Sequence, residues 1–99
     1  MKRGYWFHAG ARTEFGRAVE FYRKESTKLA EAFYLDVMAS IEALRERPLL
    51  GAPAQAGTRC KQLDRFPYTL FYRDKEDEIQ IFAVAHHRRR PGYWLKRLK

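Results

Sequence analysis

Cationic and aromatic side chains concentrate in one short stretch near the end of the chain. The stretch AVAHHRRRPGYW, residues 83–94, passes from small apolar residues typical of a sheet interior into two histidines and three consecutive arginines. A tyrosine and a tryptophan follow. Such a strand end is either a solvated basic terminus or a surface that meets phosphate or another anion.

Cleavage of a phosphodiester without a metal ion is one chemistry that these residue types permit. Internal cleavage of RNA needs a base for the 2′-hydroxyl, an acid for the leaving 5′-oxygen and cations that stabilise the developing charge. The candidate residues are Arg59, Lys61, Arg73, His87, Arg88 and Tyr93. Neighbouring strands would gather them into one basic patch, where Tyr93 or Trp94 could stack on a base.

The strand candidates also have structural interpretations. Arg59 and Lys61 alternate as solvent-facing strand residues do. Arg73 lies among aromatic residues and precedes Asp74, which favours a packing or ion-pair role. Cys60, between the first two, has the character of a small core residue.

The candidates near the end of the chain also have structural interpretations. His86 continues the strand pattern and is better explained as a hydrogen-bonded residue at the sheet end, so His87 is the better acid–base candidate. Tyr93 and Trp94 follow Pro91-Gly92 and could fold back as a hydrophobic clasp, an interpretation that is stronger for Trp94.

The positive charge is distributed unevenly. The net charge is +8, yet residues 1–85 carry 14 Lys and Arg against 12 Asp and Glu. Residues 86–99 carry six Lys and Arg and no acidic residue. This asymmetry favours an anionic partner, namely nucleic acid, an acidic protein or a membrane surface.

Several function classes lack their sequence signals. There is no Gly-rich phosphate loop, no HExxH and no serine elbow, and we expect no cofactor. The single cysteine excludes an intramolecular disulfide and argues against a cysteine-based metal site, so no metal is expected. No apolar run is long enough for a membrane span or a signal peptide, which makes the cytoplasm the expected location.

The first half of the chain predicts a strand and two helices. RGYWFHA is aromatic and strand-like, and a helical period begins near Arg12, with Thr13 as the expected N-cap. Ser26 is the expected N-cap of a second helix that ends before Pro48. The apolar stripe of this second helix consists of Leu29, Phe33, Val37, Ile41 and Leu44.

The second half predicts a loop and three strands. GAPAQAG, residues 51–57, has the composition of a loop, and TRCKQLD, YTLFYRD and EIQIFAVAH are strand-like. In the last strand, Ile79, Ile81, Ala83 and Ala85 are expected on one face and Phe82 and Val84 on the other. Apolar residues on both faces indicate a central strand.

These elements predict one α+β domain covering residues 1–99, in the order β-α-α-β-β-β. An antiparallel helical hairpin is expected on one face of a small twisted sheet. An N-terminal strand and a three-stranded antiparallel meander form this sheet, and a short basic C-terminal segment follows it.

The quoted motifs resemble one protein family. RFPYTLFYR, the charged turn and EIQIFAVAHHRRRPGYW are similar to the C-terminal half of the RelE/ParE superfamily of bacterial toxins from type II toxin–antitoxin systems. The short strand ending in Phe-His, the FYRKE segment and the ERP that closes the second helix agree with the N-terminal half. The resemblance thus covers nearly the whole chain.

The resemblance implies a compact α+β toxin that a cognate antitoxin wraps and neutralises. RelE-like members cleave mRNA in the ribosomal A site, whereas ParE-like members poison DNA gyrase. By the family's motifs, Arg59 and Lys61 fall on the basic strand of the nucleases and Arg73 matches their strand-end arginine. Arg88 and Tyr93 match the catalytic arginine and the stacking tyrosine.

The ending HHRRRPGYW is closer to the ParE-like, plasmid stabilisation branch, and the strand with Arg59 and Lys61 has fewer lysines than a RelE-like nuclease would. We therefore expect a growth-arresting toxin that inhibits gyrase. The alternatives are a metal-independent, ribosome-dependent endonuclease and a non-catalytic basic binding protein. The surface for the target or for an acidic antitoxin would consist of Arg88, Arg89, Arg90, Tyr93 and Trp94.

Overall fold

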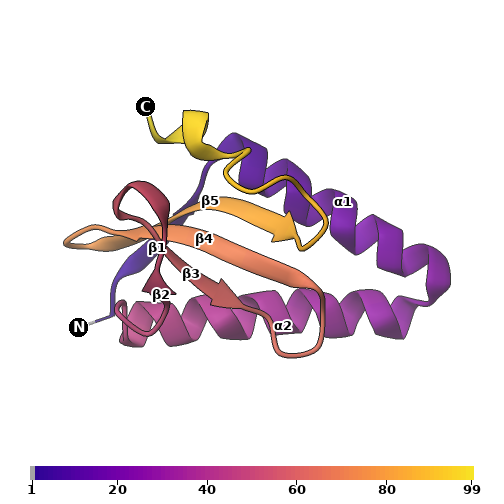
Figure 1. Cartoon of the computed structure of the whole chain (residues 1–99). Coiled ribbons are helices and arrows are strands. Elements are labelled where there is room, and N and C mark those ends of the chain that lie inside the picture. The colour runs from indigo at the N-terminus through magenta and orange to yellow at the C-terminus, as the bar shows by residue number, and fades with distance from the viewer. Residues whose placement is uncertain (1) are drawn as a thin grey trace.

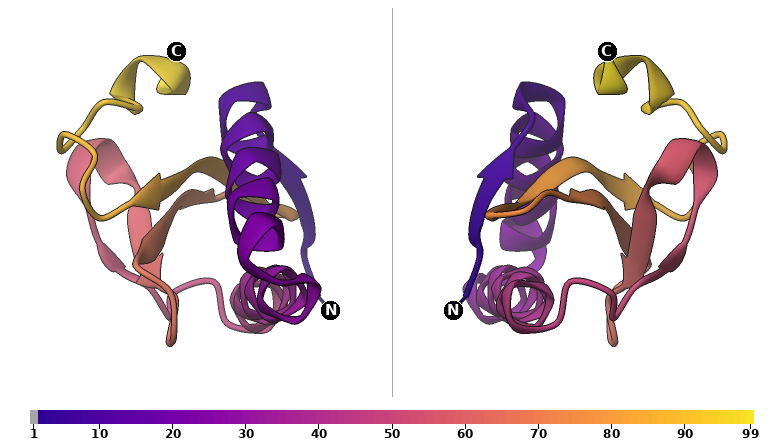
Figure 2. Two further views of the ribbon diagram at one scale, coloured as in Figure 1. Left: turned by 90° about the vertical axis from the view of Figure 1, so that its right-hand side faces the viewer. Right: turned by 90° about the vertical axis from the view of Figure 1, so that its left-hand side faces the viewer.

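The computed structural model describes residues 2–99. Two long helices lie against a five-stranded sheet, and the last residues of the chain cross the sheet's other side (Figure 1; Figure 2). The elements are β1 (Gly4–Phe7), α1 (Ala9–Glu25), α2 (Thr27–Glu46), β2 (Ala52–Pro53), the 3₁₀ turn η1 (Gln55–Gly57), β3 (Arg59–Gln62), β4 (Tyr68–Asp74), β5 (Glu78–His86) and the 3₁₀ turn η2 (Leu95–Leu98).

The sheet has the order β1-β5-β4-β3-β2. Strands β3, β4 and β5 form the expected antiparallel meander, and β1 pairs in parallel with β5. The expected α+β architecture and the central position of β5 are confirmed. The segment 51–57, expected to be only a loop, also contains the two-residue strand β2, which pairs with Arg59 and Cys60 of β3.

One residue, Ser26, caps both helices of the hairpin. The backbone N–H of Ser26 donates to Tyr22 O and ends α1, and the Ser26 side chain accepts from the backbone N–H of Leu29 and begins α2. The expected Ser26 cap is confirmed. The expected Thr13 cap is wrong: α1 begins one turn earlier, at Ala9, because His8 accepts from the Gly10 N–H through its ring nitrogen.

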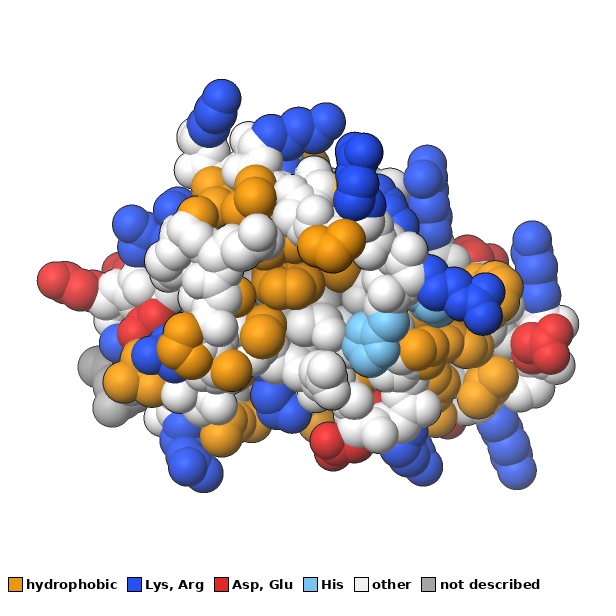
Figure 3. Space-filling view, viewed as in Figure 1, with side chains coloured by type: hydrophobic (Ala, Val, Ile, Leu, Met, Phe, Trp, Pro, Cys, Tyr) orange, Lys and Arg blue, Asp and Glu red, His pale blue; other side chains and the backbone are white. Residues whose placement is uncertain are grey.

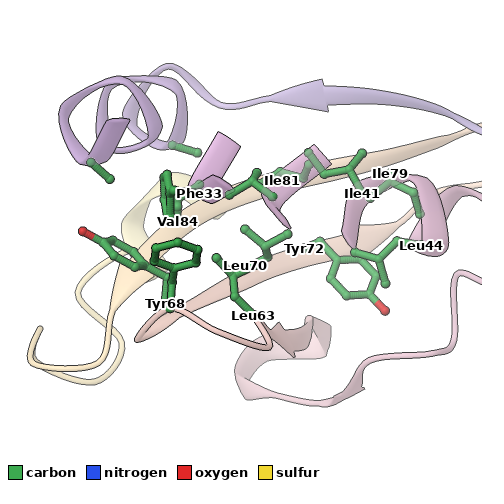
Figure 4. Packing of buried hydrophobic residues seen from close by; sticks show 14 residues of the cluster. Phe33, Ile41, Leu44, Leu63, Tyr68, Leu70, Tyr72, Ile79, Ile81 and Val84 are labelled. Carbon is green, nitrogen blue, oxygen red and sulfur yellow. The ribbon is translucent and has the colours of Figure 1, made fainter. Parts of the chain in front are cut away.

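The main core lies between the helices and the sheet (Figure 4). From the predicted stripe of α2, Phe33, Val37, Ile41 and Leu44 are fully buried, and Leu29 packs at the margin. They meet the inward-facing residues of β4 and β5, which are Tyr68, Leu70, Tyr72, Ile79, Ile81 and Val84. Each such side chain contributes roughly 1.5–3 kcal/mol by its burial.

A β-bulge changes the faces of β5. The sequence pattern put Ala83 and Ala85 on the face of Ile81 and Val84 on the opposite face, and this expectation is wrong. Phe82 is an extra residue in the pairing of β5 with β4, so the alternation shifts by one position. Val84 therefore joins the helix-side core, whereas Phe82, Ala83 and Ala85 line the second face.

Candidate functional site

The C-terminal segment, residues 87–99, folds back over the second face of the sheet (Figure 2). Trp94 is only 1% exposed, and its ring stacks on Phe71 of β4 with 4.5 Å between ring centroids. Phe82, Ala83 and Ala85 complete the buried part of this small core. Trp94 thus anchors the segment as a clasp, and its side chain is not on the surface.

One carboxylate fixes the position of this segment. Glu14 of α1 accepts the Tyr93 hydroxyl at 2.6 Å, and its two oxygens accept from the two terminal nitrogens of Arg97 at 3.0 Å each. Arg89 approaches the same carboxylate at 3.8 Å. Glu14 and Arg97 are mostly buried, with side-chain exposures of 14% and 16%, so this bidentate pair is poorly screened by solvent.

The Glu14–Arg97 pair lies beside the part of β5 that has no neighbouring strand on its β1 side. β1 ends at Phe7, so β5 has no neighbour on that side beyond Ile81. The backbone N–H of Val84 donates instead to Glu14 at 3.0 Å, and the Phe82 carbonyl accepts from Arg97 at 2.9 Å. The two charged side chains therefore satisfy backbone groups of the open strand edge.

Glu14 is not among the residues that the sequence predicted for the site, although the sequence contains a signal for it. Glu14 follows Ala11 by three positions and precedes Ala18 by four, and both alanines are buried. The carboxylate thus lies on the inward face of α1, where an acidic residue requires a partner. Gly10 makes room for that partner, because a Cβ at this position would lie 2.6 Å from Arg97 Cζ.

Tyr93 is held at its hydroxyl and at its ring. Its hydroxyl donates to Glu14, and the Arg89 guanidinium lies over its ring, 3.8 Å from the centroid. Burial, together with the adjacent Glu14 carboxylate, raises the pKa of Tyr93 above its ordinary value of 10.0. The phenol is therefore a neutral hydrogen-bond donor within the fold, and one face of its ring is already covered.

The structure does not gather the strand candidates into one patch. Arg59 and Lys61 pair in register with Tyr72 and Leu70, which face the helices, so the two cations lie on that side of the sheet. Arg59 donates to the Gly51 carbonyl at 2.6 Å and thereby holds the segment that follows α2.

Arg73 lies on the second face, away from Arg59 and Lys61. Its guanidinium lies 5.0 Å from the ring centroid of Phe82. The neighbouring Asp74 pairs with Arg3 at 2.8 Å rather than with Arg73. Packing on Phe82 is thus the contact that positions Arg73.

The two histidines have different surroundings. His86 packs edge-on against Tyr68 and accepts the backbone N–H of Arg88 through Nδ1 at 3.0 Å. Burial first, and then the adjacent charges of Arg88 and His87, lower the pKa of His86. His87 is exposed, and its Nε2 lies 3.1 Å from the hydroxyl of Thr69.

The exposed part of the candidate surface is the turn at residues 87–92. Arg88, Arg89 and Arg90 are all exposed. Within residues 2–99, neither Arg88 nor Arg90 has an acidic partner, whereas Arg89 and Arg97 share Glu14. In the view of Figure 3, most of the Lys and Arg side chains lie around the margin of the molecule with a few Asp and Glu side chains, and hydrophobic side chains lie between them.

Two further observations concern the part of the chain that the structure describes. No three His, Cys, Asp or Glu side chains come together there in a group that could hold a metal ion. No helix there is both long and apolar enough to cross a membrane.

Comparisons with known proteins agree with this architecture. Residues 5–91 match the model of the family described as the ParE toxin of the type II toxin–antitoxin system parDE. The fold is similar to that of a chain in the solved structure "Chromosomal ParDE TA system from P. aeruginosa", with a TM-score of 0.72 and 21% identity over 86% of this chain and 96% of that chain. A comparison with curated proteins finds no match. Because the family model spans most of the sequence, the chain belongs to the ParE family of toxins from type II toxin–antitoxin systems.

Proposed function

We propose that this toxin arrests growth by inhibiting DNA gyrase in the cytoplasm, and that its basic C-terminal surface binds the target without catalysing a reaction. Family membership supports the ParE-like side of the superfamily. The observation that carries the proposal is the state of Tyr93, whose hydroxyl is bound to Glu14 and whose ring is contacted by the guanidinium groups of both Arg89 and Arg97. A stacking tyrosine of a nuclease would need an open ring face near its cations.

The distribution of the other candidates supports the same conclusion. Arg59 and Lys61 lie on the helix side of the sheet, and Arg73 packs on Phe82 on the other side. A single phosphate therefore has no access to all three. The residues left for a partner are the exposed Arg88, Arg89 and Arg90, together with His87.

The alternative, ribosome-dependent cleavage of mRNA, would use Arg88 and His87 for acid–base chemistry. Two assays with purified toxin separate the functions: supercoiling by gyrase, and primer extension on mRNA from a translating extract. We expect loss of supercoiling and intact mRNA. Cleaved mRNA with normal supercoiling would overturn the proposal, and no effect in either assay or on growth would favour a non-toxic basic binding protein.

The substitution Arg88→Ala further distinguishes gyrase inhibition from mRNA cleavage. In the gyrase interpretation, the variant should need a several-fold higher concentration for the same inhibition, because one of several charge contacts is lost. In the nuclease interpretation, cleavage should disappear. Arg17→Ala, which removes an exposed arginine on α1, is the matched control and should behave as wild type.

We further propose that the antitoxin is acidic where it covers residues 86–97. Since residues 86–99 carry six cations and no acidic residue, their attraction to carboxylates should weaken with salt. Titration of the toxin with its antitoxin in low and high salt measures this effect. Binding that is independent of salt would place the antitoxin on the helical face instead.

A further inference from the structure

A pocket of about 220 Å³ opens beside the arginine turn. Its floor is the second face of the sheet at the ends of β4 and β5, formed by Thr69, Phe71 and Ala85. The chain from His87 to Trp94 forms its wall. The pocket therefore lies between the small core under Trp94 and the exposed cations of the turn.

Its size and lining fit one apolar side chain. A cavity of about 150 Å³ accommodates a benzene ring, so this pocket is large enough for an aromatic or branched aliphatic group. The floor is apolar except for the hydroxyl of Thr69, which already has His87 Nε2 as a partner at 3.1 Å. An apolar group entering there would displace water without leaving this hydroxyl unpaired.

The wall of the pocket is fixed by the fold. Arg89 N–H donates to the His86 carbonyl at 3.0 Å, and Tyr93 N–H donates to the Arg90 carbonyl at 3.3 Å. Gly92, with a φ of 75°, turns the chain between them in a conformation that favours glycine. The pocket is thus preformed, which lowers the entropy cost of filling it.

The positive charge around the pocket opening indicates which residues should flank the entering apolar side chain in its own sequence. Arg89 and Arg90 line the pocket, and Arg88 precedes them in the turn. Arg88 and Arg90 lack an acidic partner within residues 2–99. Carboxylates on both sides of an apolar residue would supply one.

We propose that this pocket receives one aromatic or branched apolar side chain from an acidic segment of the antitoxin. The assignment rests on the proposed function, in which the antitoxin neutralises the toxin by covering the surface that binds the target. The apolar side chain fixes the register of the segment, and the flanking carboxylates pair with the arginines. Neutralisation is then direct competition for the arginine turn.

The first experiment tests the pocket without the antitoxin or the target. Two synthetic peptides, acetyl-EDEFEDE-amide and acetyl-EDEAEDE-amide, have the same charge and differ in one side chain. NMR titration, followed at the Trp94 indole and the His87 ring, should show at least fivefold tighter binding of the phenylalanine peptide. Equal affinities would overturn the proposal.

Substitutions in the toxin then test whether the preference for the phenylalanine peptide arises in the pocket. Ala85→Leu fills the pocket and should abolish the preference for the phenylalanine peptide, whereas Thr69→Val keeps the volume and should preserve it. Arg90→Ala is exposed and should weaken both peptides alike. Thermal denaturation shows whether Ala85→Leu folds. If it does not, the proposal is still tested by the affinity difference between the two peptides and by the equal weakening of both that is expected for Arg90→Ala.

The antitoxin assignment is tested with the full complex. Ala85→Leu should lower the affinity of the toxin for its antitoxin at least tenfold in calorimetry. Wild-type affinity for the antitoxin, combined with loss of gyrase inhibition, would assign the pocket to the target and overturn the proposal. Because the peptide and antitoxin measurements contain no gyrase, failure of the gyrase hypothesis would be seen separately, in the supercoiling assay.

Discussion

The hydroxyl of Tyr72 joins the central sheet to the end of α2. Tyr72 is fully buried, and its hydroxyl donates to the Pro48 carbonyl at 2.6 Å and accepts the Gly51 N–H at 3.0 Å. Burial raises the pKa of this phenol, so it remains a neutral donor. Gly51 permits the approach, because a Cβ there would lie 2.7 Å from the hydroxyl oxygen.

Tyr72→Phe should therefore destabilise the fold by about 1–3 kcal/mol, since the buried Gly51 N–H and the part-buried Pro48 carbonyl lose their partner. For a domain of this size, each kcal/mol corresponds to a decrease in Tm of roughly 4–8 °C. Thermal denaturation measures the effect. Tyr34→Phe, at a tyrosine that is 47% exposed, is the control and should leave Tm unchanged. An equal Tm for both variants would contradict the role of Tyr72.

At the scale of elements, the helical hairpin depends on Ser26. Its side chain accepts the Leu29 N–H at 3.0 Å, in a chain that turns from α1 into α2 within one residue. Ser26→Ala should cost about 1 kcal/mol, because α2 loses its N-cap. Urea denaturation measures the loss. The control is Thr27→Ala, which removes an exposed hydroxyl side chain from the first turn of the same helix. A loss of stability in the control and not in Ser26→Ala would contradict the capping role.

The turn after β5 depends on the protonation state of His86. Its Nδ1 accepts the Arg88 N–H, which only the unprotonated nitrogen can do. The pKa of His86 in the folded protein lies below the ordinary value of 6.5, so the unfolded chain binds a proton more readily. The stability that follows from this lowered pKa, which burial of the ring causes first, is complete above about pH 6.5 and is lost as the pH falls through the lowered pKa.

We therefore expect the urea midpoint to decline below about pH 6.5, and this decline to be smaller in His86→Gln, which has no group titrating in this range. NMR titration of the His86 ring measures its pKa directly. A value above 6.5 would contradict the proposed contact.

At the scale of the whole molecule, Glu14 connects residues that are far apart in the sequence. Its hydrogen-bond partners lie 70, 79 and 83 positions away, so one carboxylate closes the fold between α1, the edge of β5 and the C-terminal segment. Its loss leaves Arg97 mostly buried and without this anionic partner.

Glu14→Gln should lower the free energy of unfolding by about 2–3 kcal/mol, because a poorly screened, bidentate ion pair is broken. It should also loosen residues 87–99, which hydrogen exchange would detect as faster exchange there than in α2. Glu20→Gln, at an exposed position of the same helix, is the control. Unchanged exchange in the C-terminal segment would contradict the role of Glu14.

Sequence features within single short segments predicted the helices and strands of this protein. The stripe from Phe33 to Leu44, the Ser26 cap and the apolar run of β5 each lie within one short segment, where periodicity and capping have direct meaning. The family motifs are also local, and they were sufficient to indicate a ParE-like toxin. The sequence by itself thus determined the architecture and the class of protein.

Tertiary structure alone decided the composition of the surface. The bulge at Phe82 and the pairing of Arg59 with Tyr72 depend on strand register, which no single segment encodes. The sequence left Tyr93 and Trp94 open as binding candidates or as a hydrophobic clasp, and only contacts with Glu14 and Phe71, distant in sequence, show that both side chains are held by the fold. Such contacts form only once the chain has brought α1, the sheet and the C-terminal segment together, so spacing along the sequence could not reveal them.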